Sequence, residues 1–285
     1  MTTKTILVVG SVNLDLVATG PRLPRPGETV TGATFAQHPG GKGANQSLAA
    51  RRLGCHVRLA ARVGRDATSD SALSMLRAAG VDLSGLRYDS SNSTGVALIA
   101  VAATGENQII VAAGANALLA PADLPGLQAD AIICQLEVPA TTVDFVMQTA
   151  QGFRAVNLAP ALAVPESVLM RAHLLVVNDT EAAFYGAALH RSAALVAVTH
   201  GAAGATLWQS GQCIASAASP SVHSIDTTGA GDAFVAALTL ALTEGQPPAQ
   251  ALRFACTAGA LATTRAGAQP SLPSRDDIEL RLRGV

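Results

Sequence analysis

Short apolar runs alternate with helical patterns along most of the chain. The runs contain few polar positions, which is typical of strands buried on both faces of a sheet; they lie at residues 5–9, 57–61, 131–134, 155–158, 174–177 and 195–199. Helical patterns occur between several of them, at residues 68–79, 140–151, 165–171 and 181–185. This alternation predicts a mainly parallel sheet flanked by helices on both faces.

A second pattern interrupts this order in the first half of the chain. Residues 94–102 and 108–112 flank a polar turn and predict a β-hairpin, and residues 28–35 also show a strand-like pattern. We expect these segments to form a small separate sheet, which would suit a lid that closes over a substrate and excludes water. The lid should comprise approximately residues 13–36 and 94–112.

Composition narrows the class of partner. Hydrophobic residues make up 49% of the chain and charged residues 14%, and the net charge of −1 provides no basic field for nucleic acid. No stretch approaches the roughly 18 apolar residues of a membrane span, and the N-terminus lacks a signal-peptide pattern. The four cysteines are far apart in sequence, which is typical of reduced thiols. We therefore expect a cytoplasmic protein with one α/β domain over residues 1–285 that acts on small molecules.

The stretch Asp-Thr-Thr-Gly-Ala-Gly-Asp at residues 226–232 leads directly into an apolar helical run. Gly229, Ala230 and Gly231 should lie at the helix N-terminus, where unpaired amides and the helix dipole favour an anion. Asp232 follows in the first turn, where a carboxylate can take a proton from an attacking hydroxyl. Taken alone, Asp232 is also explained as an ordinary helix-capping residue.

A second glycine-rich stretch, Gly-Gly-Lys-Gly-Ala-Asn at residues 40–45, precedes a helix predicted over residues 46–52. It is not a P-loop, because Lys42 is followed by Gly43 rather than by Ser or Thr. The stretch at residues 229–231 does not extend to a dinucleotide-binding motif either, because Phe234 occupies the third glycine position. Two glycine-rich helix starts remain without a standard phosphate motif.

Polar side chains follow several of the predicted strands. Asn13 and Asp15 come after the first strand and, two positions apart on an extended segment, should face the same side. Four more polar residues follow later strands: Glu137, Asn157, Asn178 and Thr199. Because ligands bind beyond the carboxyl ends of parallel strands, this placement predicts a shared cleft.

Nine short motifs in this order resemble those of the ribokinases, within a wider sugar-kinase family that includes adenosine kinase and phosphofructokinase B. They cover residues 10–15, 26–29, 40–45, 93–96, 114–116, 178–181, 199–201, 226–232 and 267–271. The resemblance extends over nearly the whole chain. It implies a three-layer α/β fold with a small β-sheet lid, and transfer of the γ-phosphate of ATP to the 5-hydroxyl of D-ribose.

The resemblance also implies roles for individual residues. Asp232 would be the general base, with an anion hole formed by Gly229, Ala230 and Gly231. The residues expected at the sugar are Asn13, Asp15, Gly41, Lys42, Gly43, Asn45, Glu137 and Asp232. Those expected at ATP and Mg²⁺ are Asn178, Glu181, Thr199, Gly201, Gly204, Gly231 and Cys256. A potassium site, mostly of backbone carbonyls, would involve Asp226, Thr228, Ala262, Arg265, Gly267 and Ser271.

One segment departs from the family pattern. Only residues 182–198 separate Glu181 from Thr199, where ribokinases usually carry a longer helical segment. This shortening lies beside the expected nucleotide site and bears on nucleotide contacts rather than on the reacting groups. From family behaviour and the exposed edge of a small sheet, we also expect a homodimer formed through the lid.

Two alternatives to a ribose kinase stay open from the sequence. In the first alternative, the chain is a kinase whose acceptor is deoxyribose, another pentose or a nucleoside. In the second, it is a non-catalytic sugar or nucleotide sensor. The lid segments offer mainly Phe35 and His38 to cover a nucleobase, which favours a free sugar. The intact Asp232 and anion hole favour an enzyme over a sensor.

Overall fold

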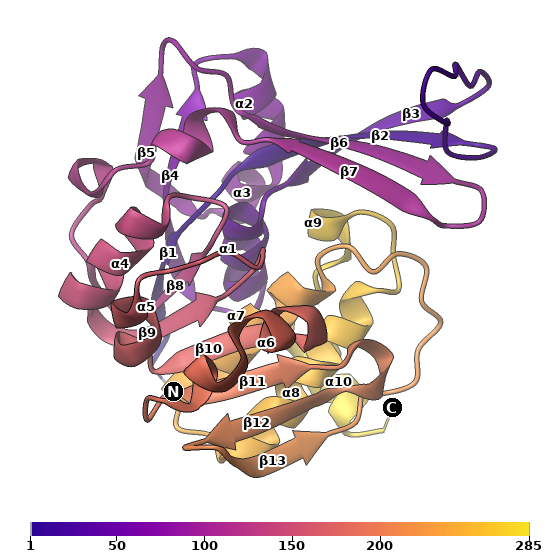
Figure 1. Ribbon diagram of the computed structural model, residues 1–285. Helices are drawn as coiled ribbons and strands as arrows, with labels where there is room; N and C mark the ends of the chain where they lie inside the picture. The colour runs from indigo at the N-terminus through magenta and orange to yellow at the C-terminus, as the bar shows by residue number, and fades with distance from the viewer. Residues whose placement is uncertain (1, 285) are drawn as a thin grey trace.

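Nine strands form the central sheet of the computed structural model, which describes residues 2–284 (Figure 1). Their order is β13-β12-β11-β10-β9-β8-β1-β4-β5; neighbours from β11 to β5 are parallel, whereas β12 and β13 are antiparallel additions at one edge. The bounds are β1 Thr5–Val9, β4 His56–Gly64, β5 Asp82–Asp89, β8 Gln128–Gln135, β9 Gln151–Asn157, β10 Leu174–Asn178, β11 Leu195–Thr199, β12 Ala205–Gln209 and β13 Gln212–Ala217. The prediction of a mainly parallel sheet is confirmed.

Helices cover both faces of this sheet. One face carries α1 Lys42–Arg52, α2 Ala67–Ala72, α3 Ser74–Ala79, α7 Ala230–Thr243, α8 Pro248–Ala262 and α10 Arg275–Leu282. The other carries α4 Ala140–Thr149, α5 Glu166–Arg171 and α6 Asp179–Tyr185. Strand β1 shows why the strands are apolar throughout: Ile6 and Val8 pack on the first helical layer, and Leu7 and Val9 on the second.

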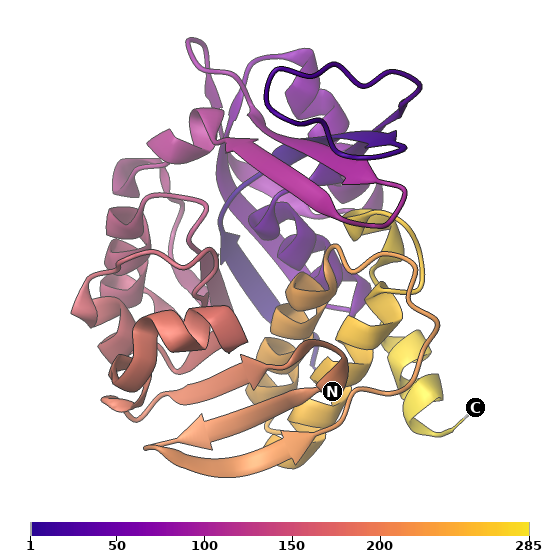
Figure 2. The same cartoon turned by 45° about the vertical axis from the view of Figure 1, so that its right-hand side comes forward.

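Four further strands form the lid sheet, in the order β3-β2-β6-β7, with bounds β2 Asn13–Gly20, β3 Thr34–Gly40, β6 Gly95–Ala102 and β7 Asn107–Ala112. Figures 1 and 2 show this sheet projecting from the body over the side where α7 and α9 (Ala268–Ser271) lie. Strand β2 begins shortly after β1 ends, and β3 ends just before α1 begins. The base of the lid therefore adjoins the first glycine-rich helix start.

Short 3₁₀ helices complete the structure, at η1 Gly114–Leu118, η2 Pro121–Asp123, η3 Gly186–His190 and η4 Gly201–Ala203. Among residues 2–284, all four cysteines are free, with Cys213 exposed and the other three buried. In the same part of the chain, no helix combines the length and the apolar character needed to cross a bilayer.

Three local predictions are wrong in their bounds. The helix expected over residues 46–52 begins earlier, at Lys42. The helix expected over residues 68–79 forms as two short helices that meet at Leu73. The strand expected over residues 28–35 begins only at Thr34, where pairing with β2 starts. Strand β5, which the sequence pattern did not predict, pairs with β4 at the edge of the central sheet.

Candidate active site

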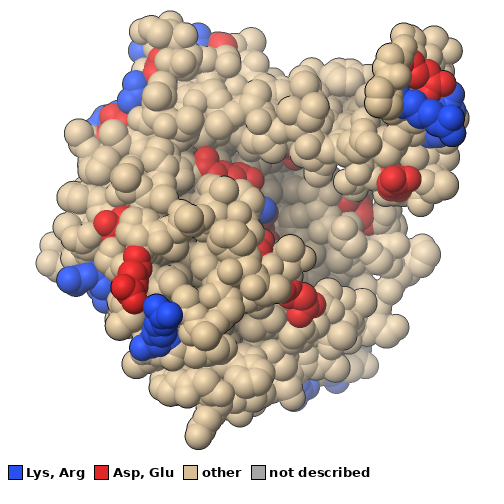
Figure 3. All heavy atoms as spheres, viewed as in Figure 1, with Lys and Arg blue, Asp and Glu red and all other residues tan. Residues whose placement is uncertain are grey.

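A cavity of about 420 Å³ opens at the carboxyl ends of the central strands, beneath the lid sheet. The four polar residues that follow β8 to β11 all line it: Glu137, Asn157, Asn178 and Thr199. The surface is hollowed here between the lid and the body, and charged atoms are visible on the walls of the hollow (Figure 3). The strand order thus brings together residues that are more than 60 positions apart in sequence.

Two helix N-termini face this cavity. Helix α7 begins at Ala230, after Gly229 in the left-handed region (φ 81°), which glycine adopts without strain. Helix α1 begins at Lys42, after Gly41, where a Cβ atom would lie 2.6 Å from the backbone nitrogen of Asn13. Both glycines line the cavity. They let the backbone approach closely at the points where free amides are available.

Asp232 lies in the first turn of α7, with its side chain buried and at the cavity wall. The Asn45 amide nitrogen donates to its Oδ2 (2.9 Å), and the Gln46 amide nitrogen donates to its Oδ1 (2.9 Å). Burial raises the pKa of Asp232, while the Lys42 ammonium and the two amides act in the opposite direction. Two donors and a nearby cation favour the ionised form that a general base requires.

Asp15 faces the same cavity from β2 of the lid sheet. Burial, followed by the charges of Glu137 and Asp232, raises the pKa of Asp15 from 3.8 to about 7, whereas Lys42 lowers it. Among residues 2–284, no protein group donates a hydrogen bond to this carboxylate. Both of its oxygens are therefore available to a ligand that donates hydrogen bonds.

Neighbouring groups fix the polar residues on either side of Asp15. The amide nitrogen of Asn116 donates to Oδ1 of Asn13 (2.8 Å), so the Asn13 amino group is free to donate elsewhere. The Glu137 carboxylate accepts from the Ser11 hydroxyl and from the backbone amide of Lys42 (3.0 Å). These contacts hold the side chains in defined orientations at the cavity wall.

The Lys42 side chain lies among four carboxylates. Burial lowers the pKa of Lys42, but the surrounding negative charges outweigh this effect and leave it above its ordinary value; they belong to Asp232, Glu137, Glu181 and Asp15. Gly43, predicted at the sugar, does not line the cavity. A Cβ atom there would be 2.5 Å from the Ser11 backbone nitrogen. Gly43 allows the helix start to pack against the end of β1.

The buried Asp15 predicts a dependence of stability on pH. Between the unfolded pKa near 3.8 and the folded pKa of about 7, the folded state holds a proton that the unfolded state has lost, so stability falls as pH rises through this range. Asp15→Asn removes this effect. Since a tenfold change in proton affinity corresponds to about 1.4 kcal/mol, we expect the variant to gain on the order of 2–4 kcal/mol over wild type at pH 8.

Urea unfolding of the ligand-free protein at pH 4 and pH 8 measures this difference, which should shrink towards zero at pH 4. Asp276→Asn, at an exposed position in the first turn of α10, is the matched control. An Asp15→Asn variant that is less stable than wild type at pH 8 would show that the carboxylate has a protein partner.

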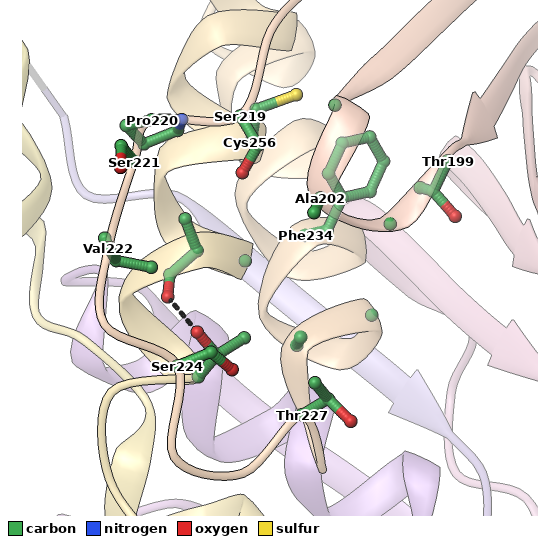
Figure 4. A pocket seen from close by; sticks show the side chains of 17 residues that line it. Thr199, Ala202, Ser219, Pro220, Ser221, Val222, Ser224, Thr227, Phe234 and Cys256 are labelled. Atoms are coloured by element: carbon green, nitrogen blue, oxygen red, sulfur yellow. Dashed lines mark hydrogen bonds between the residues drawn. The ribbon is translucent and has the colours of Figure 1, made fainter.

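A second cavity of about 480 Å³ adjoins the first and shares Thr199, Thr227 and Gly231 with it. Three other residues expected at the nucleotide line it: Gly201, Gly204 and Cys256. The loop side chains of Ser219, Pro220, Ser221, Val222 and Ser224 line it, together with the helical Phe234 and Cys256 (Figure 4). The sequence pattern did not single out the 219–224 loop, which carries no distinctive motif.

Asn178 and Glu181 lie at the start of α6 and line the first cavity. The Glu181 backbone amide donates to Oδ1 of Asn178 (2.9 Å), and the Asn178 amide donates to Oε2 of Glu181 (2.8 Å). Burial raises the pKa of Glu181, while the hydrogen bond from the Asn178 backbone amide and the charge of Lys42 act in the opposite direction. The capping pair holds a carboxylate and its oxygens beside the junction of the two cavities.

The residues expected at potassium lie on two joined loops and the helix ends next to them. Oδ1 of Asp226 accepts from the Thr228 amide (2.9 Å), and its Oδ2 accepts from the Gly267 amide (2.8 Å). The carbonyl of Thr263, directly after Ala262, accepts from the Asp226 amide (3.1 Å). Arg265 is exposed in the second loop, and the Ser271 hydroxyl donates to the Ala268 carbonyl at the end of α9. This arrangement supports the loop that begins α7.

Several residues of the site were not predicted. The buried Gln46 and Gln135 lie behind Asp232, and the lid contributes the apolar side chains of Ala97, Ile99, Ile109 and Val111 to the cavity. The four lid residues could have been predicted from the sequence, because alternate positions of a β-strand face the same side of its sheet. No spacing in the sequence connects Gln46 with Gln135.

The buried carboxylate of Asp232 lines the first cavity, and the N-terminus of α7 adjoins both cavities. In an α/β fold, this arrangement is that of an enzyme that transfers a group to an alcohol. The pfkB family of carbohydrate kinases matches residues 3–275. Ribokinase from Bacillus subtilis is 37% identical over 97% of this chain and 98% of its own. The chain therefore belongs to the pfkB carbohydrate kinase family, as the sequence motifs indicated.

Solved structures agree with this assignment. Ribokinase from Thermotoga maritima superposes with a TM-score of 0.90 at 32% identity, covering 98% of this chain and 99% of its own. Arabidopsis thaliana ribokinase complexed with ribose and ATP superposes with a TM-score of 0.87 at 27% identity, covering 99% of both chains. The ribokinase-like fold expected from the sequence is confirmed.

Proposed function

We propose that this chain is a ribokinase, which transfers the γ-phosphate of ATP to the 5-hydroxyl of D-ribose. The observation that carries the proposal is that Asp15, without a protein partner among residues 2–284, and Asp232, beside the α7 N-terminus, face one cavity. A carboxylate with two free oxygens suits a sugar with adjacent hydroxyls, and a buried base at a helix N-terminus suits phosphoryl transfer. The names of the relatives and the ribose and ATP bound in the Arabidopsis enzyme support this choice.

Sugar recognition follows from the polar groups of the first cavity. Asp15 would accept from two adjacent ring hydroxyls, and the free amino group of Asn13 would donate to a sugar oxygen. Oδ1 of Asn45 is buried without a partner among the described residues, because its amide nitrogen is used by Asp232. It would accept a further sugar hydroxyl. These contacts would direct the 5-hydroxyl towards Asp232.

Phosphoryl transfer would take place at the junction of the two cavities. Asp232 would accept the proton of the 5-hydroxyl as its oxygen bonds to the γ-phosphorus of ATP bound in the second cavity, and the bond to the ADP oxygen breaks. The amides of residues 229–231 would stabilise the negative charge on the transferred group. Lys42, held among carboxylates, would add positive charge on the sugar side.

The metal ions expected from the family fit the oxygen donors present. Glu181 and Asn178 place a carboxylate and amide oxygen beside the junction, as Mg²⁺ prefers, and would hold it there. Mg²⁺ would neutralise charge on the ATP phosphates. Carbonyl oxygens around Asp226, Thr228, Ala262, Arg265, Gly267 and Ser271 suit potassium, which would hold the loop before α7 in place.

A coupled ADP-release assay over D-ribose, 2-deoxyribose and several nucleosides, with and without potassium, tests the proposal. D-ribose should give the highest kcat/KM, and potassium should increase turnover. Turnover highest on a nucleoside would assign a different acceptor. No turnover on any sugar by folded protein would favour a sensor.

The lid sheet also supports the homodimer that the family suggests. Ile109 and Val111 line the cavity, so Ile110 between them faces away from it, 69% exposed, opposite the exposed Leu98 of β6. We infer that this outer apolar face contacts a second lid. Light scattering should give a mass near two chains for wild type, and Ile110→Lys should shift it towards one. A wild-type mass of one chain at micromolar concentration would exclude this dimer.

A further inference from the structure

A line of buried amide side chains leads away from Asp232 into the body. The Gln46 amide nitrogen donates to Oδ1 of Asp232 (2.9 Å) and to Oδ1 of Asn157 (3.2 Å). The carbonyl oxygen of Gln46 accepts from the amide nitrogen of Gln135 (2.6 Å). Gln46 and Gln135 are fully buried, and Asn157 is 8% exposed. These residues come from α1, β8 and β9, so three separate elements meet behind the base.

A backbone carbonyl determines the direction of every bond in this line. The carbonyl oxygen of Val176 can only accept, so the Asn157 amino group faces it (3.3 Å) and Oδ1 of Asn157 faces Gln46. Gln46 must then present its amino group to Asn157 and Asp232, and its carbonyl to Gln135. A reversed Gln46 would set its oxygen against two acceptors. Gln135 therefore stabilises the one orientation of Gln46 that donates to Asp232.

This orientation matters because nearby charges also act on Asp232. They belong to the Lys42 ammonium and to the carboxylates of Glu137 and Asp15. Hydrogen bonds to the ionised form of an acid favour that form, and the donor from Gln46 is one of two that Asp232 receives. Gln46 also fixes the rotation of the carboxylate, which decides where its remaining lone pairs point.

We propose that Gln46 and Gln135 are positioning residues for the general base: Gln46 holds Asp232 through a donated hydrogen bond, and Gln135 holds Gln46 in the donating orientation. The proposal rests on the proposed function, because it concerns the role of Asp232 in that reaction. Neither glutamine lines the two cavities, so neither is expected to touch sugar or nucleotide.

The test is the pH profile of kcat at saturating ribose, for Gln46→Met, Gln135→Met and the double variant. Methionine keeps the length of the side chain and removes its amide. The profile of kcat is used because Asp15 also titrates in the free enzyme. Gln128→Met, at an exposed position on the same strand as Gln135, is the matched control and should match wild type.

We expect Gln46→Met to move the acid limb up by about one pH unit, so kcat falls about tenfold at pH values well below the wild-type midpoint, with KM for ribose changed less than about threefold. Gln135→Met should shift the limb less, in the same direction. The double variant should match Gln46→Met, because Gln135 acts through Gln46. An unmoved acid limb in folded Gln46→Met, or additive shifts in the double variant, would overturn the proposal.

A second measurement does not depend on turnover. The carboxyl carbon of Asp232, assigned in NMR spectra by its loss in Asp232→Asn, should titrate at higher pH in Gln46→Met than in wild type. An unchanged titration would also overturn the proposal. If wild type has no turnover on ribose, the proposed function fails, and this titration still decides whether Gln46 controls the ionisation of Asp232.

Discussion

Asp232→Asn is expected to lower kcat by about 10²–10⁴-fold, while KM for ribose changes only a few-fold. The amide keeps the shape of the side chain but cannot accept the proton of the 5-hydroxyl. The other sugar contacts, at Asp15 and Asn13, are left in place. Steady-state kinetics with ribose and ATP varied separately measures both constants.

Asp232→Ala serves as a second variant, because one of the two amino groups that donate to Asp232, from Asn45 and Gln46, would face an amino group in the Asn variant. Asp276→Asn, at an exposed position far along the chain, should keep wild-type turnover. If both Asp232 variants retained more than a tenth of wild-type kcat, another group would have to be the base.

Asp15→Ala is expected to raise KM for ribose by about 10²-fold or more, with a much smaller effect on kcat. Hydrogen bonds to a charged group contribute about 1.5–3 kcal/mol each, and this carboxylate has two free oxygens for the sugar. Calorimetric titration of ribose without ATP measures the loss of affinity directly. Asp15→Asn keeps one acceptor and should fall between Ala and wild type.

The two variants together separate binding from chemistry. If an Asp15 variant lost kcat but kept its affinity for ribose, Asp15 would act in the chemical step rather than in sugar binding. Without ligand, the Asp15→Asn variant should be more stable than wild type at neutral pH. Unfolding would therefore not explain a loss of ribose affinity in this variant.

Much of the central sheet could be predicted because its strands are buried on both faces. β1 and β10 are short, apolar at nearly every position and followed by polar residues, and their pattern differs clearly from that of the helices between them. The glycine-rich start of α7 was equally clear, whereas α1 begins at Lys42, four residues before the predicted start. In α7 a carboxylate follows in the first turn, and the resemblance to the ribokinases singled it out from an ordinary cap.

Other parts of the structure depend on contacts that local sequence does not encode. Strand β5 lies at an edge, and its mixed burial leaves no clear period of two. The turn-rich stretch before β3 carries Gly27 and Gly32 with positive φ, so pairing begins later than its pattern suggests. Gln46 and Gln135 meet across 89 positions, and only the packing of α1 on β8 brings them together.

The two carboxylates that define the site belong to different parts of the fold. Asp15 is on β2 of the lid sheet, and Asp232 is on α7 of the body. Both line one cavity, so an acceptor that fills this cavity contacts both carboxylates, whereas a single water molecule at Asp232 leaves Asp15 without a ligand. The geometry therefore favours the sugar over water as the acceptor and limits wasteful hydrolysis of ATP when no sugar is bound.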